Sequence, residues 1–281
     1  MQSKPIKKTT GGSVQYDGAG VKLVRVIGNQ DIYDFDPFLM LDAFDSTDPN
    51  DYVKGFPWHP HRGIETVTYL ISGKIEHGDS LGNEGSINDG CCQWMTAGSG
   101  IIHQEMPKPA KRMLGSQLWI NLPQADKMTD PVYRDIRSEQ IPTVKEEGVT
   151  VRVISGTYAG TNGPEQGDFV KTIYLDVKLE PNTEWKFSVD PRKTAFCYMV
   201  EGSALVSDTK QKIESGLGVL FGEGDTIEIT ATEEGIRFFL YVAKPLGEPI
   251  AWRGPIVMNT QDELKLASKE LRDGTFIKHK V

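Results

Sequence analysis

The sequence predicts an all-β protein built from two jelly-roll barrels, with a minor helix near the C-terminus. Short segments rich in Val, Ile, Thr and aromatic residues recur between clusters of Gly, Pro, Asn and Asp, which is typical of strands joined by turns. The two halves of the chain also share a weak pattern of strands and glycine turns. Closing such antiparallel strands into barrels removes their exposed edges, so barrels are favoured over an open sheet.

The individual elements follow from this pattern in chain order. The predicted strands are Val21–Ile27, Thr66–Ile71, Gln117–Leu122, Thr150–Ile154, Thr172–Leu179, Phe196–Val200 and Arg237–Val242. One helix is predicted after them. Thr260 and Glu263 have the spacing of a capping box, and apolar residues then repeat at helical spacing up to Gly274.

An internal repeat indicates that the two barrels are related. Thr68–Ile75 (TYLISGKI) can be laid over Cys197–Ala204 (CYMVEGSA) at a shift of 197 − 68 = 129 residues. Gly90–Met95 (GCCQWM) matches Gly216–Phe221 (GLGVLF) at a shift of 216 − 90 = 126 residues. Each half therefore has the order strand, glycine turn, strand, loop, glycine turn, strand.

The length of the chain supports two domains. At 281 residues it is near the size at which a single core gives way to two. We expect an N-terminal barrel over residues 1–135 and a C-terminal barrel with the terminal helix over residues 136–281. The Pro- and Glu-containing stretch Gln124–Gly148 is the expected linker region.

Composition excludes several classes of protein. Against 31 Lys and Arg stand 39 Asp and Glu, and the basic clusters Lys4–Lys8 and Lys108–Arg112 lack interleaved aromatics, so direct nucleic-acid binding is disfavoured. No apolar stretch has the length of a membrane span or a signal peptide. The three cysteines form neither an even set nor a Cys-x-x-Cys pair, which argues against disulfides and zinc ribbons. We therefore expect a soluble cytoplasmic protein.

Three of the five histidines lie in two short motifs, WHPHRG and IIHQEM. In an extended strand, residues i and i+2 point to the same face. His59 therefore pairs with His61, and His103 pairs with Glu105. Two adjacent strands could aim these four side chains at one point inside a barrel, so we predict a single metal site there.

The donor set limits the metal and indicates chemistry. Three neutral imidazoles and one carboxylate suit Fe(II), Mn(II), Co(II), Ni(II), Cu(II) or Zn(II) better than Mg or Ca. An octahedral ion held by four protein atoms keeps two positions for water, a chelating substrate or dioxygen, as a catalytic site requires. Glu105 could also leave the metal and accept a proton from a bound hydroxyl, which makes it the candidate catalytic residue.

Three other titratable residues have weaker signals. His77 lies in a predicted loop or hairpin without a spaced partner, so an exposed side chain is expected. His279 lies in a Lys-rich tail and is expected to have no role. Glu65 follows His61 by four residues and is either a hydrogen-bond partner of a metal ligand, an alternative ligand itself, or a carboxylate at the surface or core edge.

Two further pairs leave alternatives open. Cys91 and Cys92 are expected to be small buried residues, and a redox-sensing thiol is the minority alternative. Phe56 and Trp58 could form the wall of an aromatic substrate pocket or lie in the core.

Longer segments around the motifs resemble the pirin family of the cupin superfamily. They are Phe35–Asp42 (FDPFLMLD), Phe56–Thr66 (FPWHPHRGIET), Gln93–Pro107 (QWMTAGSGIIHQEMP), Gln117–Pro123 (QLWINLP) and Gly247–Pro255 (GEPIAWRGP). The resemblance covers most of the chain. It implies a bicupin whose N-terminal barrel alone holds a divalent metal, with Fe(II) as the first expectation.

The resemblance also assigns site residues. The family's metal ligands fall on His59, His61, His103 and Glu105, without a departure at any of the four. In the second half, the piece aligned with the first histidine pair is Ser188–Asp190 (SVD), which offers one carboxylate only.

The resemblance implies two kinds of function. One is a quercetin 2,3-dioxygenase-like reaction, in which a flavonol-like aromatic and dioxygen react and carbon monoxide is lost. The other is a non-enzymatic redox or metal sensor that binds a protein partner, as described for animal members of the family. A third possibility, another cupin reaction such as a sugar isomerisation or a hydrolysis, stays open because function belongs to the site and not to the fold.

Overall fold

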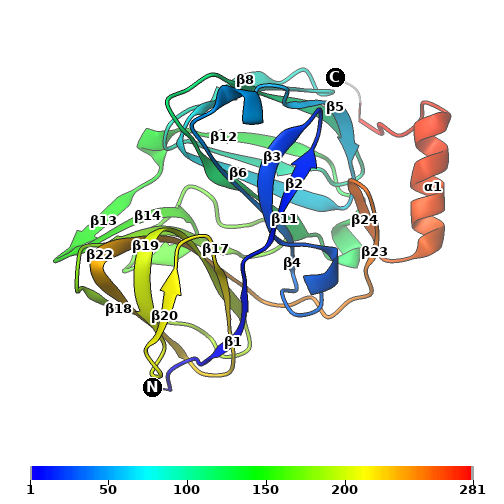
Figure 1. Cartoon of the computed structure of the whole chain (residues 1–281). Helices are drawn as coiled ribbons and strands as arrows, with labels where there is room; N and C mark the ends of the chain where they lie inside the picture. The colour runs from blue at the N-terminus through cyan, green and yellow to red at the C-terminus, as the bar shows by residue number, and fades with distance from the viewer. Residues whose placement is uncertain (1, 280–281) are drawn as a thin grey trace. The chain divides into compact units, whose positions relative to one another are not determined.

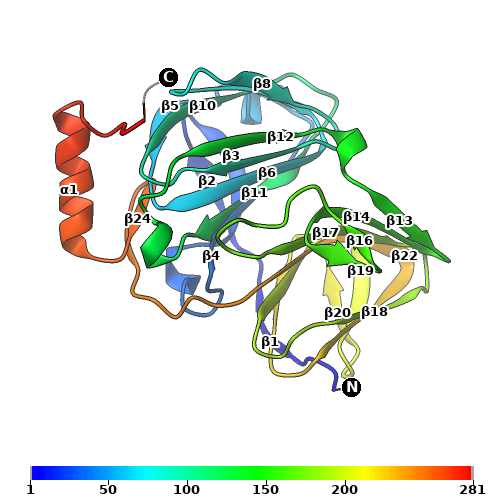
Figure 2. The same ribbon diagram turned by 180° about the vertical axis from the view of Figure 1, so that it is seen from behind.

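The computed structural model describes residues 2–279 and confirms the all-β prediction (Figures 1 and 2). Strands make up 55% of the structure and helices 9%. The chain forms two compact units. Unit 1 comprises the described residues of 1–12, 33–37 and 139–245, and unit 2 those of 13–32, 38–138 and 246–281.

Unit 2 contains two antiparallel sheets. Strands of the first are β2 (Ser13–Asp17), β3 (Val21–Ile27), β4 (Phe38–Ser46), β6 (Ile64–Ser72), β9 (Cys92–Thr96), β11 (Met113–Asn121) and β12 (Val132–Ile136). Their order in the sheet is β12-β9-β6-β11-β4-β3-β2. Strands of the second are β5 (Phe56–His61), β7 (Lys74–Asp79), β8 (Glu84–Ile87) and β10 (Ile101–Lys108). These four are ordered β5-β10-β7-β8.

The remaining elements of unit 2 are short. They are the hairpin of β23 (Ala251–Arg253) and β24 (Ile256–Met258), the helix α1 (Gln261–Arg272), and the 3-10 turns η1 (Asn29–Asp31), η2 (Pro49–Asp51) and η3 (Gln124–Asp126). The predicted capping box of α1 is confirmed. Thr260 Oγ1 accepts a hydrogen bond from Glu263 N at 3.2 Å, and Glu263 Oε2 accepts one from Thr260 N at 2.8 Å. No helix in the described part of the chain is long and apolar enough to cross a membrane.

The two sheets of unit 2 pack face to face through apolar clusters that contain side chains of both. One cluster consists of Val21, Leu23, Phe44, Tyr52, Leu70, Ile75, Ile87 and Met113. The other consists of Ile32, Leu39, Met40, Ile64, Met95, Ala97, Ile101, Trp119 and Val257. Burial of these side chains holds the sheets together, at about 1.5–3 kcal/mol for each large one.

Unit 1 is built on one nine-stranded antiparallel sheet that encloses its own core. Its strands are β1 (Ile6–Thr10), β13 (Thr143–Glu146), β14 (Val149–Ser155), β17 (Ile173–Leu179), β18 (Glu184–Ser188), β19 (Thr194–Val206), β20 (Gln211–Glu214), β21 (Gly218–Phe221) and β22 (Thr226–Ala243). A small hairpin of β15 (Thr157–Tyr158) and β16 (Thr161–Asn162) and the turn η4 (Ser138–Gln140) complete the described elements. The core includes Val151, Leu175, Met199 and Phe238, all fully buried.

The strand orders of the two units bear out the internal repeat. In unit 2 the order β9-β6-β11-β4-β3-β2 contains the two matched strands β6 and β9 as neighbours. In unit 1 the order β21-β19-β22-β17-β14-β13 contains their counterparts β19 and β21 in the same relation. The matched glycine turns also agree, because Gly73 and Gly202 both have positive φ, at 121° and 79°.

The structure divides the chain differently from the predicted ranges 1–135 and 136–281. Strand β1, from the N-terminus, pairs with β21 in unit 1, while residues 246–281 with α1 belong to unit 2. Strand β1 gives β21 backbone partners on a side that would otherwise be an edge, whereas β23 and β24 pair with each other. The passage from unit 2 to unit 1, between residues 138 and 139, lies inside the expected linker Gln124–Gly148, but this stretch also contains β12 and β13, which are strands of the two sheets.

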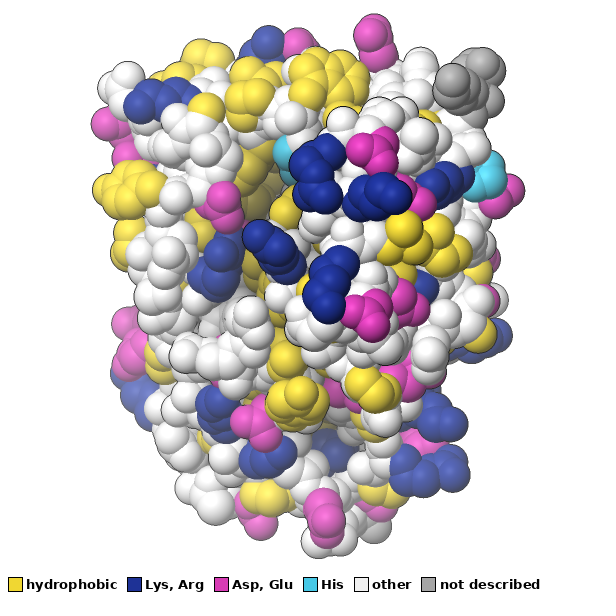
Figure 3. Space-filling view, turned by 90° about the vertical axis from the view of Figure 1, so that its right-hand side faces the viewer, with side chains coloured by type: hydrophobic (Ala, Val, Ile, Leu, Met, Phe, Trp, Pro, Cys, Tyr) yellow, Lys and Arg dark blue, Asp and Glu magenta, His cyan; other side chains and the backbone are white. Residues whose placement is uncertain are grey.

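A cavity of about 550 Å³ opens in unit 2. It is lined by Asp17, Gly18, Arg25, Asn29, Met40, Asp42, Phe56, Pro57, His59, His61, Gln117, Trp119, Trp252, Gly254 and Pro255. Figure 3 shows a hollow with hydrophobic walls and a histidine at its edge. The cavity is large enough for a ligand of drug size.

Candidate metal centre

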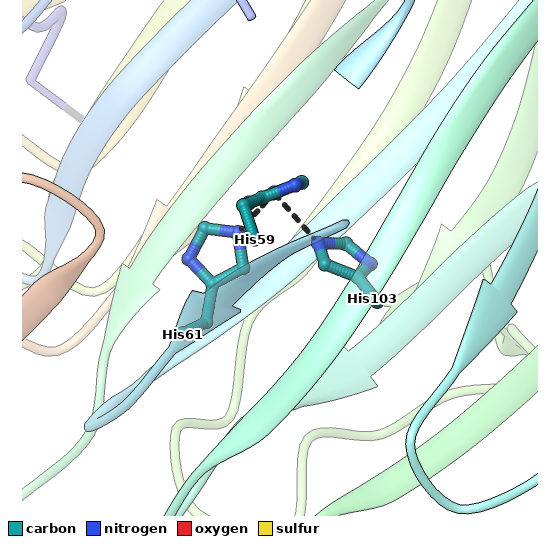
Figure 4. Close-up of side chains that lie close together, drawn as sticks. All are labelled: His59, His61 and His103. Carbon is teal, nitrogen blue, oxygen red and sulfur yellow. Dashed lines mark hydrogen bonds between the residues drawn. The ribbon is translucent and has the colours of Figure 1, made fainter. Parts of the chain in front are cut away.

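Three of the predicted ligands meet at one point, on two paired strands. β5 and β10 run antiparallel, and His59 lies directly opposite His103 in their register. The Nε2 atom of His59 is 3.0 Å from Nε2 of His61 and 3.0 Å from Nε2 of His103 (Figure 4). The ligand atoms of the three residues all lie within 4.8 Å of one another. The i, i+2 spacing thus places the histidine pair as predicted.

Hydrogen bonds at the other ring nitrogens identify the atoms that face a metal. His59 Nδ1 lies 2.9 Å from the carbonyl oxygen of Pro57, and His61 Nδ1 lies 3.2 Å from that of Pro255. A carbonyl oxygen only accepts, so each Nδ1 carries the proton and each neutral ring has a bare lone pair at Nε2. Two lone pairs that face each other repel. A cation among them turns this repulsion into coordination, so the donor set fits a divalent metal.

Burial keeps the ligands in the form that binds a metal. His61 and His103 are each 2% exposed, and His59 is half-buried. Desolvation, helped by the nearby charge of His59, lowers the pKa of His61 to about 3. Desolvation also lowers the pKa of His103 well below its ordinary value. Both rings therefore stay neutral over the physiological range, as coordination requires.

Glu105 follows on the same strand as His103, but its side chain is bound by other residues than the histidines. It follows His103 by two residues on β10, is 3% exposed, and is separated from His103 by a bulge in the pairing with β5. Its two carboxylate oxygens accept hydrogen bonds from Gln117 Nε2 at 2.9 and 3.0 Å. Thr68 Oγ1 donates a third at 3.3 Å. That Glu105 is the fourth ligand stays a prediction.

The partners of Glu105 belong to a polar row that crosses the seven-stranded sheet. Residues that lie directly opposite each other on neighbouring strands share a face. The polar row consists of Asp135, Gln93, Thr68, Gln117, Asp42 and Arg25, each paired with the next in the strand register. Sequence reasoning missed Gln117 and Thr68. The available signal was a polar side chain within strands that are otherwise largely apolar.

Family models match both units. Residues 20–120 match the model described as Pirin, and residues 174–277 match the Pirin C-terminal cupin domain. A pirin-like protein from Caulobacter vibrioides is 43% identical over 280 residues, which covers 98% of this chain and 100% of that protein. The chain belongs to the pirin family. Pirin from Homo sapiens is 38% identical over 275 residues, covering 96% of this chain and 93% of its own.

A solved pirin-like structure agrees with this fold. The crystal structure of quercetin 2,3-dioxygenase from Acinetobacter baumannii superposes with a TM-score of 0.88 at 32% identity, over 97% of this chain and 98% of that one. Both units of this pirin are cupin domains. In the described chain, the one group of three or more His, Cys, Asp or Glu with metal-binding spacing is that of His59, His61 and His103. In unit 1, Asp190 instead forms an ion pair with Arg192 at 2.8 Å.

The expectation that His77 is exposed is wrong. In this pirin His77 lies on β7, directly opposite Glu105 on β10, so its side chain faces the interior and is 1% exposed. Its Nε2 contacts the Tyr133 hydroxyl and lies 3.4 Å from Asp135 Oδ1. Tyr133 also donates a hydrogen bond to Asp135 and accepts one from Gln93 at 3.3 Å. The alternation of Ile75, His77 and Asp79 along one strand was the missed signal.

The structure also places the other residues that the sequence singled out. Phe56 lines the cavity, whereas Trp58 is 55% exposed and lies outside the lining residues. Glu65 accepts a hydrogen bond from Thr96 at 2.7 Å and lies on the face of β6 opposite to Thr68, which favours the structural alternative. None of the three cysteines forms a disulfide in the described part of the chain, and Cys91 is half-exposed. His279 forms an ion pair with Asp130 at 3.2 Å.

Replacing Gln117 by leucine tests how Glu105 is held. The change removes two hydrogen bonds to a buried carboxylate, so we expect the metal-free protein to lose about 1–3 kcal/mol of unfolding free energy. If Glu105 also binds the metal, saturating metal should recover part of this loss, because the ion then satisfies the carboxylate. Urea unfolding with and without metal measures both effects. Gln104→Leu, next to Glu105 on β10 but on the other face of that strand, is the matched control, and an equal loss there would contradict the prediction.

Proposed function

We propose that this protein is a metal-dependent dioxygenase that cleaves the ring of a flavonol-like substrate. The proposed reaction is of the quercetin 2,3-dioxygenase type. The observation that carries the proposal is the convergence of three histidine Nε2 atoms at the wall of a cavity lined with aromatic side chains. The family match and the structural likeness to a quercetin 2,3-dioxygenase support it. When bound, a divalent metal such as Fe(II) supplies a Lewis acid and a redox centre.

The cavity walls suit a planar aromatic. The ring of His61 lies edge-on to Trp119, with centroids 5.0 Å apart and an interplanar angle of 88°. Trp119 in turn packs against Trp252 at 5.8 Å, and Phe56 lies 6.3 Å from His59. These faces would bind a flat ring system by burial and stacking, and they would exclude water from the reacting end.

Glu105 is the proposed proton acceptor. Its carboxylate is buried two residues after His103 on β10, and Gln117 and Thr68 fix its orientation. A substrate hydroxyl that binds next to His103 would pass its proton to a Glu105 oxygen, which leaves the substrate electron-rich. The two hydrogen bonds from the Gln117 amide would restrict the Glu105 carboxylate to small movements between the metal and the substrate hydroxyl.

The test is aerobic turnover of quercetin by protein loaded with iron, and separately with Mn, Co, Ni, Cu or Zn. We expect loss of the flavonol absorbance, uptake of one dioxygen per substrate and release of carbon monoxide, with none of these in the metal-free protein. Quercetin that stays unchanged with every bound metal would rule out this substrate. An affinity for a protein partner that depends on the iron oxidation state, without turnover, would favour the sensor alternative.

A further inference from the structure

Two carboxylates and one guanidinium form a second polar feature of the same cavity. Arg25 on β3 donates from Nε to Asp42 Oδ1 at 2.9 Å and from Nη2 to Asp42 Oδ2 at 2.8 Å. Nη2 also donates to Asp17 Oδ2 at 2.8 Å. All three residues line the cavity. They belong to the seven-stranded sheet or its first hairpin, whereas His59 and His61 belong to the facing four-stranded sheet.

This arrangement leaves hydrogen-bonding groups without protein partners. A guanidinium has five N–H groups, and the two on Arg25 Nη1 make no hydrogen bond within residues 2–279. The side-chain amide of Asn29, at the start of η1, also lines the cavity and makes none among the described residues. Because both Asp42 oxygens hold the guanidinium, its plane is fixed and Nη1 is a preorganised donor.

The charge balance selects what can bind here. Arg25, Asp17 and Asp42 sum to +1 − 2 = −1, and they are the only Lys, Arg, Asp or Glu among the cavity-lining residues. An anionic substituent next to Asp17 and Asp42 would meet this negative excess at short range, which costs free energy. A neutral hydroxyl can accept from Arg25 or Asn29 and donate to Asp17, so it satisfies both kinds of group.

We infer that Arg25, Asn29 and Asp17 form a subsite for an uncharged phenolic hydroxyl on the part of the substrate that does not chelate the metal, and that this subsite rejects carboxylate, sulfate and phosphate substituents. The inference rests on the proposed function, since the chelating end of the substrate is placed at the histidines. The wall of the cavity that contains the histidines then favours an acidic chelating group. The wall that contains Arg25 favours a neutral hydroxyl.

Ligand binding to zinc-loaded protein under nitrogen tests this without turnover. The probes are 3-hydroxyflavone and its derivatives with one added hydroxyl or one added carboxylate at position 7 or 4′. We expect one hydroxyl derivative to bind about tenfold more tightly than the parent, as one hydrogen bond to a charged group predicts. The matching carboxylate should bind at least about tenfold more weakly than the parent.

Variants assign the effect to the subsite. Asn29→Ala and Arg25→Lys should bring the affinity ratio of hydroxyl derivative to parent towards one, and Asp17→Asn should relieve the carboxylate penalty. Asn29 and Asp17 are exposed enough for these variants to fold even if Arg25→Lys does not. Gln30→Ala, an exposed neighbour outside the lining, should keep the wild-type ratio.

The outcomes separate the two proposals. Equal affinities of parent and hydroxyl derivatives in the wild type, or an unchanged ratio in both Asn29→Ala and Arg25→Lys, would overturn the subsite and leave the proposed function standing. Failure of 3-hydroxyflavone itself to bind the zinc-loaded protein would overturn both.

Discussion

Replacing His61 by alanine should abolish stabilisation of the protein by metal. With the wild type at a metal concentration of about 100 Kd, binding to the native state alone adds about 2.7 kcal/mol to the free energy of unfolding. Loss of a supporting hydrogen bond to a ligand already weakens metal affinity by about 10–100-fold, so loss of a ligand should weaken it by 100-fold or more. At the same metal concentration the gain then falls to about 0.4 kcal/mol or less. Calorimetric titration and denaturant unfolding measure the two quantities.

The metal-free variant separates coordination from packing. His61 packs against Trp119, so its removal costs some packing energy, but it also relieves the facing lone pairs of His59 and His61. The quantity to compare between variants is therefore the increase in unfolding free energy on adding metal, and not the unfolding free energy of the metal-free protein. His279→Ala, at a half-exposed histidine outside the site, should keep the full gain. A metal gain in His61→Ala equal to that in His279→Ala would show that the three histidines are not the site.

The sequence predicted the parts of the site that depend on local geometry. His59 and His61 share a face because of strand alternation alone, and the α1 capping box depends on residues three apart. The pairing of β5 with β10, which brings in His103, came from the assumption that the two motifs are neighbours. Most predicted strands lie within observed ones for the same reason: turn residues and β-branched runs act locally.

The features that were missed depend on register and on distant segments. Gln117 faces Glu105 only because β11 and β10 belong to two sheets that pack together, and a one-residue slip would reverse its face. His77 was expected to be exposed in a loop or hairpin because it has no spaced partner, yet it is buried on β7, directly opposite Glu105. Pro255 orients His61 from 194 residues away in the chain. Tertiary contacts of this kind leave no periodic signal.

Arg62, next to His61 in sequence, shows how the C-terminal segment holds the ligand strand. Its side chain is 2% exposed and forms an ion pair with Glu270 on α1, with Nη1 and Oε2 2.7 Å apart. Nε donates to Ser99 O at 2.7 Å and Nη2 donates to Phe276 O at 2.9 Å. The guanidinium also lies 4.2 Å from the Phe276 ring centre. One buried cation thus ties the end of β5 to the helix and the segment after it.

Replacing Arg62 by methionine should lower the free energy of unfolding by about 3–5 kcal/mol. Methionine fills much of the volume, but the change leaves the Ser99 and Phe276 carbonyl oxygens without a donor and Glu270 with Lys278 as its remaining partner. That loss is a large part of the 5–15 kcal/mol typical of a folded domain. Metal affinity should fall as well, because the C-terminal segment that Arg62 anchors also carries Pro255, whose carbonyl oxygen accepts a hydrogen bond from His61 Nδ1 at 3.2 Å.

Arg112→Met is the matched control, since Arg112 also forms a close ion pair, with Asp45 at 2.7 Å, but with side chains 36% and 54% exposed. Exposed pairs contribute about 0–1 kcal/mol, because water and salt screen the charges, so this variant should lose no more than that and should keep its metal affinity. Urea titrations of the two variants measure the difference. Equal losses would mean that burial does not strengthen the Arg62 interactions. A large loss in Arg62→Met with unchanged metal affinity would instead mean that the C-terminal segment stabilises unit 2 without orienting His61.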